Sequence, residues 1–475
     1  MTTYATERSV RRQDAATDAL LGSRRSPRLL WNLAATAIVW GTSLVILALW
    51  IHGGGIQAVI GLNAETYSTL GRLTGLISAN LLLYQVLLMA RVPIFERGWG
   101  RDGLVRAHRL TGFWSFWLML AHIALLSIGY AVNAHVNPLL QLWDFVWNYP
   151  GMMLATAGTG LLILVVVTSI RKARKKLRYE SWHLIHLYAY LGVGLAIPHM
   201  LWTGSDFIGQ PLVSAYWWTL WAIAAAAVLV FRLLVPLSRS MRHDLRVVAV
   251  EADGSNGVTV RMRGRDIHKL GAQAGQFFNW RFLDGPGWTR SHPFSLSTAP
   301  RGDELTVTAR IVGDGTSRMT RMRKGTKVMF EGPYGAMTGD ARRRSKMLML
   351  GAGAGVAPLV AILEAERFVP GEAILVTRDH DPAHALRRPQ IARMVAKRGL
   401  RHYTLDGHRS HGDSTWIPAT HASWAGEDLL RYIAPDIEDY DIFLCGPGHW
   451  MDSIRDDLLE TGILPSQIHS ENFSI

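Results

Sequence analysis

The two halves of the chain differ in how hydrophobic and polar residues are arranged. Residues 29–236 are dominated by long apolar runs, whereas residues 240–475 show the short alternating runs of an ordinary soluble protein. A helix needs about 20 apolar residues to cross the hydrocarbon core of a bilayer. The first half therefore predicts six membrane-spanning helices, at about 29–51, 70–93, 108–130, 150–170, 181–202 and 214–236.

The loops between these segments differ sharply in charge. Basic residues lie in the tail of residues 1–28, in the loop between the second and third segments, and in residues 171–178, which read RKARKKLR. The other three loops, at about 52–69, 131–149 and 203–213, contain no Lys or Arg. Because positive loops stay on the cytoplasmic side, we predict a multi-pass plasma-membrane protein with both termini cytoplasmic. Residues 1–28 are then a basic cytoplasmic tail rather than a signal peptide.

Composition narrows the class of protein further. The chain is 49% hydrophobic and 18% charged, with a net charge of +13. The positive charge sits in short blocks between apolar segments, which is the membrane pattern and excludes a nucleic-acid partner. The single cysteine, Cys445, excludes an internal disulfide and a cysteine-ligated iron–sulfur cluster.

Histidines recur at matched depths on two of the predicted spanning helices. His108 and His122 are fourteen residues apart in the third segment, and His186 and His199 are thirteen apart in the fifth. Each spacing corresponds to roughly 20 Å along a helix. Ionisable residues inside a bilayer are costly and usually functional. We therefore predict metal ligands: His108 with His186 on the cytoplasmic side, and His122 with His199 on the outer side, each pair holding a b-type haem iron.

Alternatives to this pairing stay open at the level of sequence. Thirteen residues place His199 about 140° around the helix from His186, although a kink at Pro198 could rotate it. His183 lies nearly one turn before His186 and is a rival for the inner ligand. The four histidines could also be polar residues packed between helices without any metal.

The second half predicts two further domains. Residues 245–335 contain short β-like runs separated by glycine-rich turns, which favours a small antiparallel β-barrel. Residues 346–475 alternate strands with helices, which favours a parallel α/β sheet. The expected fold is a six-helix all-α transmembrane bundle followed by these two domains. Its boundaries are a tail of 1–28, a transmembrane domain of 29–239, a β-barrel of 240–338 and an α/β domain of 339–475.

Three motifs in the second half are suited to binding phosphate groups. GAGAGVAP (351–358) joins a strand to a helix, where glycines allow a close approach to a pyrophosphate. RSHPFSLS (290–297) offers an arginine for a phosphate and a serine for a flavin edge. RIVGDGTSRM (310–319) places small and hydroxyl residues where a helix begins.

These motifs follow the six predicted helices in this order. Together with those helices, they resemble the ferric reductase and NADPH oxidase superfamily. The resemblance covers about residues 60–475 and includes the histidine spacings. HPFSLSTAP resembles the family's FAD signature and RIVGDGTSRM its pyrophosphate element. The nicotinamide-side series is represented by EGPYG (331–335), GAGAGVAP, LCGPG (444–448) and ENF (471–473).

The resemblance implies a role for each matching residue. His292, Pro293, Phe294 and Ser295 would line the flavin ring and Arg290 its phosphates, while Gly315, Thr316 and Ser317 would hold the FAD pyrophosphate. Gly351, Gly353 and Gly355 would receive the NAD(P)H pyrophosphate, and Cys445, Gly446 and Pro447 would border the nicotinamide. Phe473 would cover the flavin, although Ser474 and Ile475 follow it where the family often ends. Arg378 and Arg409 are candidates for the 2′-phosphate that distinguishes NADPH from NADH.

The implied function is electron transfer from cytoplasmic NADPH through FAD and two b-type haems to an acceptor outside the membrane. Dioxygen, reduced to superoxide, and ferric iron are the expected acceptors, and the lipid bilayer is the expected surrounding. A quinone or a partner protein could replace the acceptor. An alternative of another class is a membrane transporter or scaffold with a vestigial reductase domain.

Overall fold

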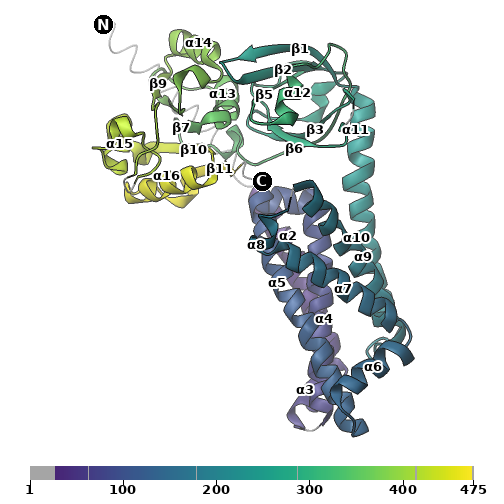
Figure 1. The fold of residues 1–475 in the computed structure, drawn as a ribbon. Helices are drawn as coiled ribbons and strands as arrows, with labels where there is room; N and C mark the ends of the chain where they lie inside the picture. The colour runs from purple at the N-terminus through teal and green to yellow at the C-terminus, as the bar shows by residue number, and fades with distance from the viewer. Residues whose placement is uncertain (1–26, 63, 178, 286, 412–413, 473–475) are drawn as a thin grey trace. The chain divides into compact units, whose positions relative to one another are not determined.

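A computed structural model describes residues 27–475 apart from 63, 178, 286, 412–413 and 473–475. The chain forms two compact units (Figure 1). Residues 28–99 and 103–233 form the helical unit, and residues from Leu234 onward make up the C-terminal unit. The basic tail predicted for residues 1–28 lies almost entirely outside the described residues.

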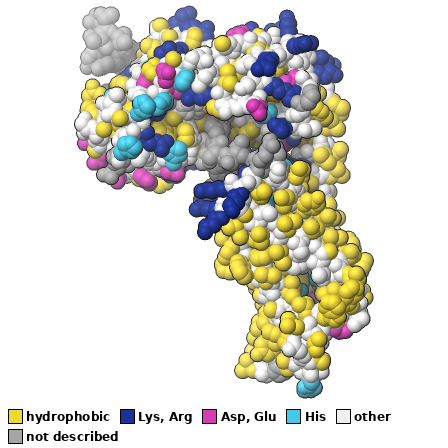
Figure 2. All heavy atoms as spheres, in the orientation of Figure 1, with side chains coloured by type: hydrophobic (Ala, Val, Ile, Leu, Met, Phe, Trp, Pro, Cys, Tyr) yellow, Lys and Arg dark blue, Asp and Glu magenta, His cyan; other side chains and the backbone are white. Residues whose placement is uncertain are grey.

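The helical unit contains the predicted spanning helices, and the last of them continues along the chain into the C-terminal unit. Six helical segments are long and apolar enough to cross a membrane: 30–52, 65–89, 103–134, 152–169, 181–203 and 211–243. Figure 2 shows hydrophobic side chains over much of the visible surface of this unit. Large side chains such as Leu33, Leu184 and Trp218 are more than half exposed. Such a surface is stable in lipid and costly in water, which agrees with a membrane-spanning bundle. The segments belong to α2 (Pro27–His52), α4 (Ala64–Met89), α5 (Pro93–Ala134), α7 (Met152–Ser169), α9 (Tyr179–Thr203) and α10 (Pro211–Val228) with η1 (Leu229–Leu234) and α11 (Val235–His243).

Parts of the loops between the spans are also helical. The short helices are α3 (Gly55–Ile60), α6 (Pro138–Asn148) and α8 (Arg171–Arg174). The side chain of Asn137 caps α6 by accepting a hydrogen bond of 2.8 Å from the amide of Leu139, and Pro138 occupies the first turn. Trp143 and Trp147 are exposed on α6, as expected for aromatic side chains at a membrane surface.

The third spanning helix is longer than the sequence predicts. We expected it to begin near His108, but the spanning segment already begins at Gly103. A kink at Gly100, which has a φ of +68°, separates this segment from a short helical stretch that begins at Pro93, and α5 includes both. His108 therefore lies inside α5 rather than at its start.

Helices α7 and α9 approach each other closely at two glycines. A Cβ atom on Gly158 would lie 2.6 Å from the Gly192 carbonyl oxygen, and one on Gly192 would lie 3.0 Å from that of Gly158. Small residues allow backbones to pack tightly in a membrane, where no hydrophobic effect drives helices together. This contact holds α9, which carries two of the predicted haem ligands, against α7.

The C-terminal unit begins with two three-stranded antiparallel sheets. Their inward side chains, among them Val260, Trp280 and Phe330, form one shared core. Isolated bridges from Leu296 to Val307 and from Arg246 to Lys327 join one sheet to the other, as the predicted barrel requires. In sheet order the strands are β1 (Arg246–Asp253), β2 (Gly257–Arg263) and β5 (Glu304–Arg310), then β4 (His292–Ser295), β3 (Phe277–Phe282) and β6 (Val328–Tyr334).

Helix α11 packs against this barrel-like part. The Ser240 hydroxyl accepts a hydrogen bond of 3.0 Å from the Phe330 amide, and Arg239 donates to the Gly332 carbonyl at 2.7 Å. Both contacts are made to β6, so α11 is part of the C-terminal unit.

The remaining residues form the predicted parallel α/β domain. Its five strands run in the order β11 (Ile468–Asn472), β10 (Tyr440–Gly446), β7 (Lys346–Ala352), β8 (Ala373–Arg378), β9 (Arg401–Thr404). Alternate residues of each strand face opposite layers. Met347 and Met349 pack with α13 (Val356–Ala365) and α14 (Arg388–Arg398), while Leu348 and Leu350 pack with α15 (Gly426–Ile433) and α16 (Gly448–Glu460).

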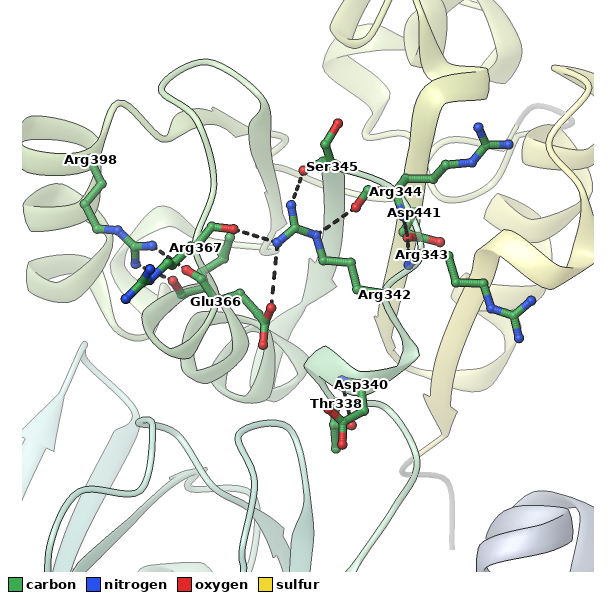
Figure 3. Close-up of polar contacts among 11 residues, drawn as sticks. Thr338, Asp340, Arg342, Arg343, Arg344, Ser345, Glu366, Arg367, Arg398 and Asp441 are labelled. Atoms are coloured by element: carbon green, nitrogen blue, oxygen red, sulfur yellow. Dashed lines mark hydrogen bonds and ion pairs between the residues drawn. The ribbon is translucent and has the colours of Figure 1, made fainter. Parts of the chain in front are cut away.

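A buried arginine ties together the turn before β7 and the end of α13. Arg342, with a side chain only 3% exposed, donates to the carbonyls of Arg344 at 2.8 Å, Arg367 at 2.6 Å and Ser345. It also lies 3.7 Å from the Glu366 carboxylate. Figure 3 shows Arg342 directed into this network, whereas the side chains of Arg343 and Arg344 point away from it.

Replacing Arg342 by Ala should destabilise this domain. The substitution leaves three carbonyls without their donor and a partly buried carboxylate without its cation. We expect the free energy of unfolding to fall by about 2–4 kcal/mol, measured by thermal or denaturant unfolding of the purified protein. The exposed neighbour Arg343 is the matched control, and Arg343→Ala should change stability little. Equal stability of the two variants would contradict the role given to Arg342.

Candidate functional site

The structure brings the four predicted intramembrane ligands together as two pairs. The ring centres of His108 and His186 are 6.1 Å apart, and those of His122 and His199 are 6.4 Å apart. Two imidazoles bound to opposite sides of one iron at about 2 Å each place their ring centres roughly 6 Å apart. Both separations therefore fit one iron between each pair.

Hydrogen bonds fix the tautomer of the outer pair. Nδ1 of His122 lies 2.7 Å from the Gly71 carbonyl oxygen, and Nδ1 of His199 contacts the Ala196 carbonyl. A carbonyl can only accept, so each Nδ1 carries the hydrogen and each Nε2 keeps its lone pair for a metal. Helix α4 can approach this closely because Gly75 has no side chain, since a Cβ there would lie 2.4 Å from Nδ1 of His122.

The inner pair is held differently. Nδ1 of His186 lies 3.3 Å from the Ser169 hydroxyl oxygen at the end of α7. The backbone carbonyl of His108 accepts a hydrogen bond of 2.6 Å from the side-chain amide of Gln85. The ring nitrogen Nδ1 of His108 is buried and has no hydrogen-bond partner in the part of the chain that the structure describes. Both pairs form even though their spacings on α5 and α9 differ by one residue. Pro198 lies inside α9 directly before His199, where the sequence places a possible kink.

The two flavin motifs lie side by side in the C-terminal unit. A Cβ on Gly315 in α12 (Asp314–Met319) would lie 2.6 Å from Cε1 of His292 in β4, so the glycine allows the ring to pack there. Burial, followed by the nearby charges of Arg290 and Arg318, lowers the pKa of His292. The Ser295 hydroxyl is buried and has no hydrogen-bond partner among the described residues. A buried hydroxyl of this kind is suited to a polar edge of a ligand.

The other predicted flavin residues surround these two elements. Arg290 is exposed in the turn before β4, beside Pro293 and Phe294 in sequence. The Thr316 hydroxyl accepts from the amides of Val312 at 3.0 Å and Gly313 at 3.3 Å, which fixes the first turn of α12. Ser317 lies half-buried on the same turn.

The nucleotide motifs meet where the strand order of the parallel sheet reverses. The chain runs outward from β7 to β8 on one side and returns to β10 on the other. In sheets of this kind, ligands bind in a crevice outside the carboxyl ends of the strands at this point. Gly351 pairs in register with Cys445. A Cβ on Gly355 would lie only 2.1 Å from the Cys445 carbonyl oxygen, so the two loops are in direct contact.

Further residues lie around the carboxyl ends of β7 and β10. Gly353 has a φ of +56° and lies against the Arg310 guanidinium, which links the nucleotide loop to the start of the second flavin motif. Gly446 is buried, and Pro447 precedes α16 as its cap residue. A Cβ on Gly335 would lie 2.7 Å from the Glu471 carboxylate, so EGPYG also reaches the last strand. Phe473 lies outside the described residues.

Known proteins resemble this chain over parts of its length. A model of the ferric reductase like transmembrane component matches residues 74–197. A heavy chain of the superoxide-generating NADPH oxidase of Dictyostelium discoideum is 23% identical over 43% of this chain and 40% of its own length. The chain therefore resembles the ferric reductase and NADPH oxidase superfamily, as its motifs predict. It is a multi-pass membrane protein with six candidate spans.

Other relatives each match about half of this chain or less. The heme-binding subunit of the protein-methionine-sulfoxide reductase of Klebsiella pneumoniae is 29% identical over 41% of this chain and 91% of its own length. The ferredoxin reductase component of a 3-ketosteroid-9-alpha-monooxygenase from Rhodococcus rhodochrous is 22% identical over 50% of this chain and 66% of its own. The chain thus spans less than half of the Dictyostelium heavy chain and about two thirds of the Rhodococcus reductase.

The single cysteine of the chain is shielded from solvent. Cys445 is fully buried at the end of β10, and burial, with Glu471 nearby, raises the pKa of its thiol. A protonated thiol is a poor nucleophile. We expect no labelling of Cys445 by a maleimide at pH 7–8 in the folded protein and complete labelling after denaturation, measured by mass spectrometry. Rapid labelling of folded protein would contradict this placement.

The two arginines predicted for the 2′-phosphate differ in their surroundings. Arg378, at the end of β8, donates to the carbonyls of Asp379 and Trp416. Burial lowers the pKa of Arg378, and neighbouring Asp406 opposes that effect. Arg409 is exposed and donates to Nε2 of His449 after β10. Arg409 is therefore the more accessible of the two cations for a phosphate.

One charged pair was missed by the sequence reasoning. Arg72 in α4 donates to the hydroxyls of Ser205 at 3.0 Å and Thr69 at 3.1 Å, and lies 3.9 Å from the Asp206 carboxylate. Burial raises the pKa of Asp206, an effect that Arg72 opposes. A lone arginine inside an apolar segment is costly in a membrane, and that signal could have identified it.

Proposed function

We propose that this oxidoreductase moves electrons from cytoplasmic NADPH, through FAD and two b-type haems, to an acceptor on the outer side of the membrane. The observation that carries the proposal is the pair of histidine clamps, His108 with His186 and His122 with His199, each spaced for one iron. In this assignment residues 29–239 bind the haems, 240–338 bind FAD and 339–475 bind NAD(P)H.

The chain's own residues supply binding and orientation. Bound FAD would supply the conversion of a two-electron hydride into single electrons, and haems held by the two histidine pairs would supply single-electron transfer across the bilayer. Ser295 would donate its buried hydroxyl to the flavin, and the first turn of α12, with Gly315, Thr316 and Ser317, would face its pyrophosphate. Gly351, Gly353 and Gly355 leave room for the nucleotide pyrophosphate, while Cys445, Gly446 and Pro447 border the same crevice.

The direction of transfer follows from the charge of the loops. The basic segment 171–178 lies between the fourth and fifth spans, and loops without Lys or Arg lie at the opposite ends. The positive-inside rule then places both termini, and with them the nucleotide crevice, in the cytoplasm. In this orientation His122 and His199 form the outer pair.

Dioxygen or ferric iron is the proposed acceptor. The Dictyostelium relative is named for superoxide generation, which favours dioxygen. The Klebsiella relative is named as a haem-binding subunit of a methionine-sulfoxide reductase, and this favours a partner protein as the second candidate. Accessible Arg409 supports NADPH over NADH as the donor.

Measuring nucleotide oxidation in membranes that contain the overexpressed chain tests this proposal. NADPH or NADH is supplied with dioxygen, a ferric chelate or a quinone in turn, with a superoxide trap alongside. We expect NADPH oxidation that depends on dioxygen or ferric iron and is faster than NADH oxidation. If no acceptor accelerates oxidation above that of membranes lacking the chain, the proposed function is wrong.

A further inference from the structure

The last residue of α7 contacts the predicted inner ligand and its neighbour on α9. The Ser169 hydroxyl oxygen lies 2.7 Å from the Val165 carbonyl oxygen, 3.3 Å from Nδ1 of His186 and 3.3 Å from Nε1 of Trp182. One side chain of α7 therefore contacts two residues of α9 that are one helical turn apart.

The hydrogen-bond capacity of a hydroxyl allows one arrangement of these contacts. Ser169 has one hydrogen and two lone pairs. Its hydrogen must go to the Val165 carbonyl, which can only accept. The indole Nε1 of Trp182 can only donate, so it occupies one lone pair. The second lone pair then accepts from Nδ1 of His186, which must carry the hydrogen and leaves Nε2 as the metal-binding nitrogen.

Stacking restrains the same imidazole from another side. The ring centres of Trp182 and His186 are 4.9 Å apart, with an angle of 32° between the planes. The Arg174 guanidinium carbon lies 4.5 Å from the centre of the Trp182 ring, so the indole is also held by the basic segment before α9. The hydrogen bond sets the tautomer of His186, and the stack limits rotation of its ring.

We propose that Ser169 and Trp182 are positioning residues that make His186, rather than His183, the inner axial ligand. This inference rests on the proposed haem pair. Hydrogen-bond partners of a ligating histidine fix its orientation and raise its basicity. The outer ligands use backbone carbonyls for this task, whereas His186 uses a side chain, so the inner site alone can be altered by substituting one residue.

The two residues should shift the inner haem potential in opposite directions. Ser169→Ala removes the acceptor, makes His186 less basic and destabilises ferric iron, so the potential of one haem rises. Trp182→Phe keeps an aromatic ring but removes the donor that competes for the hydroxyl, so the His186 bond strengthens and the potential falls. A general loosening of the structure would instead shift the inner haem potential in the same direction in both variants.

Redox titration of the haem absorption bands in the purified full-length protein tests the inference, together with electron paramagnetic resonance of the ferric haems. In Ser169→Ala we expect one haem to titrate at a higher potential and to bind about tenfold more weakly, with the other haem unchanged. Ser169→Thr should restore the wild-type signals. Thr168→Val removes the neighbouring hydroxyl, which bonds the Leu164 carbonyl at 2.8 Å, and should change neither haem.

The possible outcomes separate this inference from the proposed function. Unchanged potentials and spectra in both Ser169→Ala and Trp182→Phe, with two haems bound, would overturn the inference and leave the proposed function standing. Loss of the inner haem in His183→Ala but not in His186→Ala would overturn it as well. A wild-type protein without haem bands would overturn the proposed function and the inference with it.

Discussion

Replacing His122 or His199 by Ala should remove one of two haems and abolish reduction of the outer acceptor, while NADPH still reduces the flavin. The two side chains form the outer pair at 6.4 Å between ring centres, and a single imidazole cannot hold a low-spin haem on both faces. The flavin and nucleotide motifs lie in the other unit, so their chemistry should be untouched. Haem content should fall by about half, measured by the pyridine haemochrome assay.

A histidine outside the pairs provides the control for this experiment. His135 follows α5, is exposed and has a φ of +53°, which Asn also tolerates. His135→Asn should keep both haems and full acceptor reduction. Loss of flavin reduction in a folded His122→Ala protein would show that the two modules do not act separately, as would retention of both haems.

Replacing Gly355 by Ala should lower NADPH reduction of the flavin by about 100-fold. The new Cβ would lie 2.1 Å from the Cys445 carbonyl oxygen, so the loop must move by about 1 Å from the crevice. A displacement of that size misplaces the nicotinamide relative to the flavin. The rate is measured by stopped-flow absorbance of the flavin band.

Chemical reduction provides the internal control for this variant. Dithionite bypasses the nucleotide, so it should reduce flavin and haems in Gly355→Ala to the same extent as in the wild type. Thermal unfolding checks that the domain is intact. Wild-type NADPH reduction rates in the variant would exclude the crevice between β7 and β10 as the nucleotide site.

The architecture could be predicted from the sequence because each part leaves a pattern of its own. Six apolar runs of spanning length, strand-like alternation and the strand–helix series all appear in the structure as expected. The start of α5 could not be placed, because hydropathy detects the lipid-facing run and not the polar helical turns that precede it. Helix α6 was missed for a similar reason, since it is too short to span.

The sequence predicts the site residues that belong to local motifs, but not the contacts between those motifs. Spacing named all four paired histidines but could not choose between His183 and His186, because both lie on a similar face of α9. The structure places His186 beside His108. Contacts between segments far apart in sequence, such as Arg72 with Asp206, leave no local pattern and became visible only in three dimensions.

Electron transfer across the membrane can be measured in sealed vesicles that contain the purified protein and enclose an electron acceptor. NADPH is added outside, where it reaches only protein whose nucleotide domain faces outward, and reduction of the enclosed acceptor is followed by absorbance. We expect reduction inside the vesicles that is lost in His122→Ala and His199→Ala. Flavin reduction by NADPH with no electron reaching the enclosed acceptor in the wild type would contradict it.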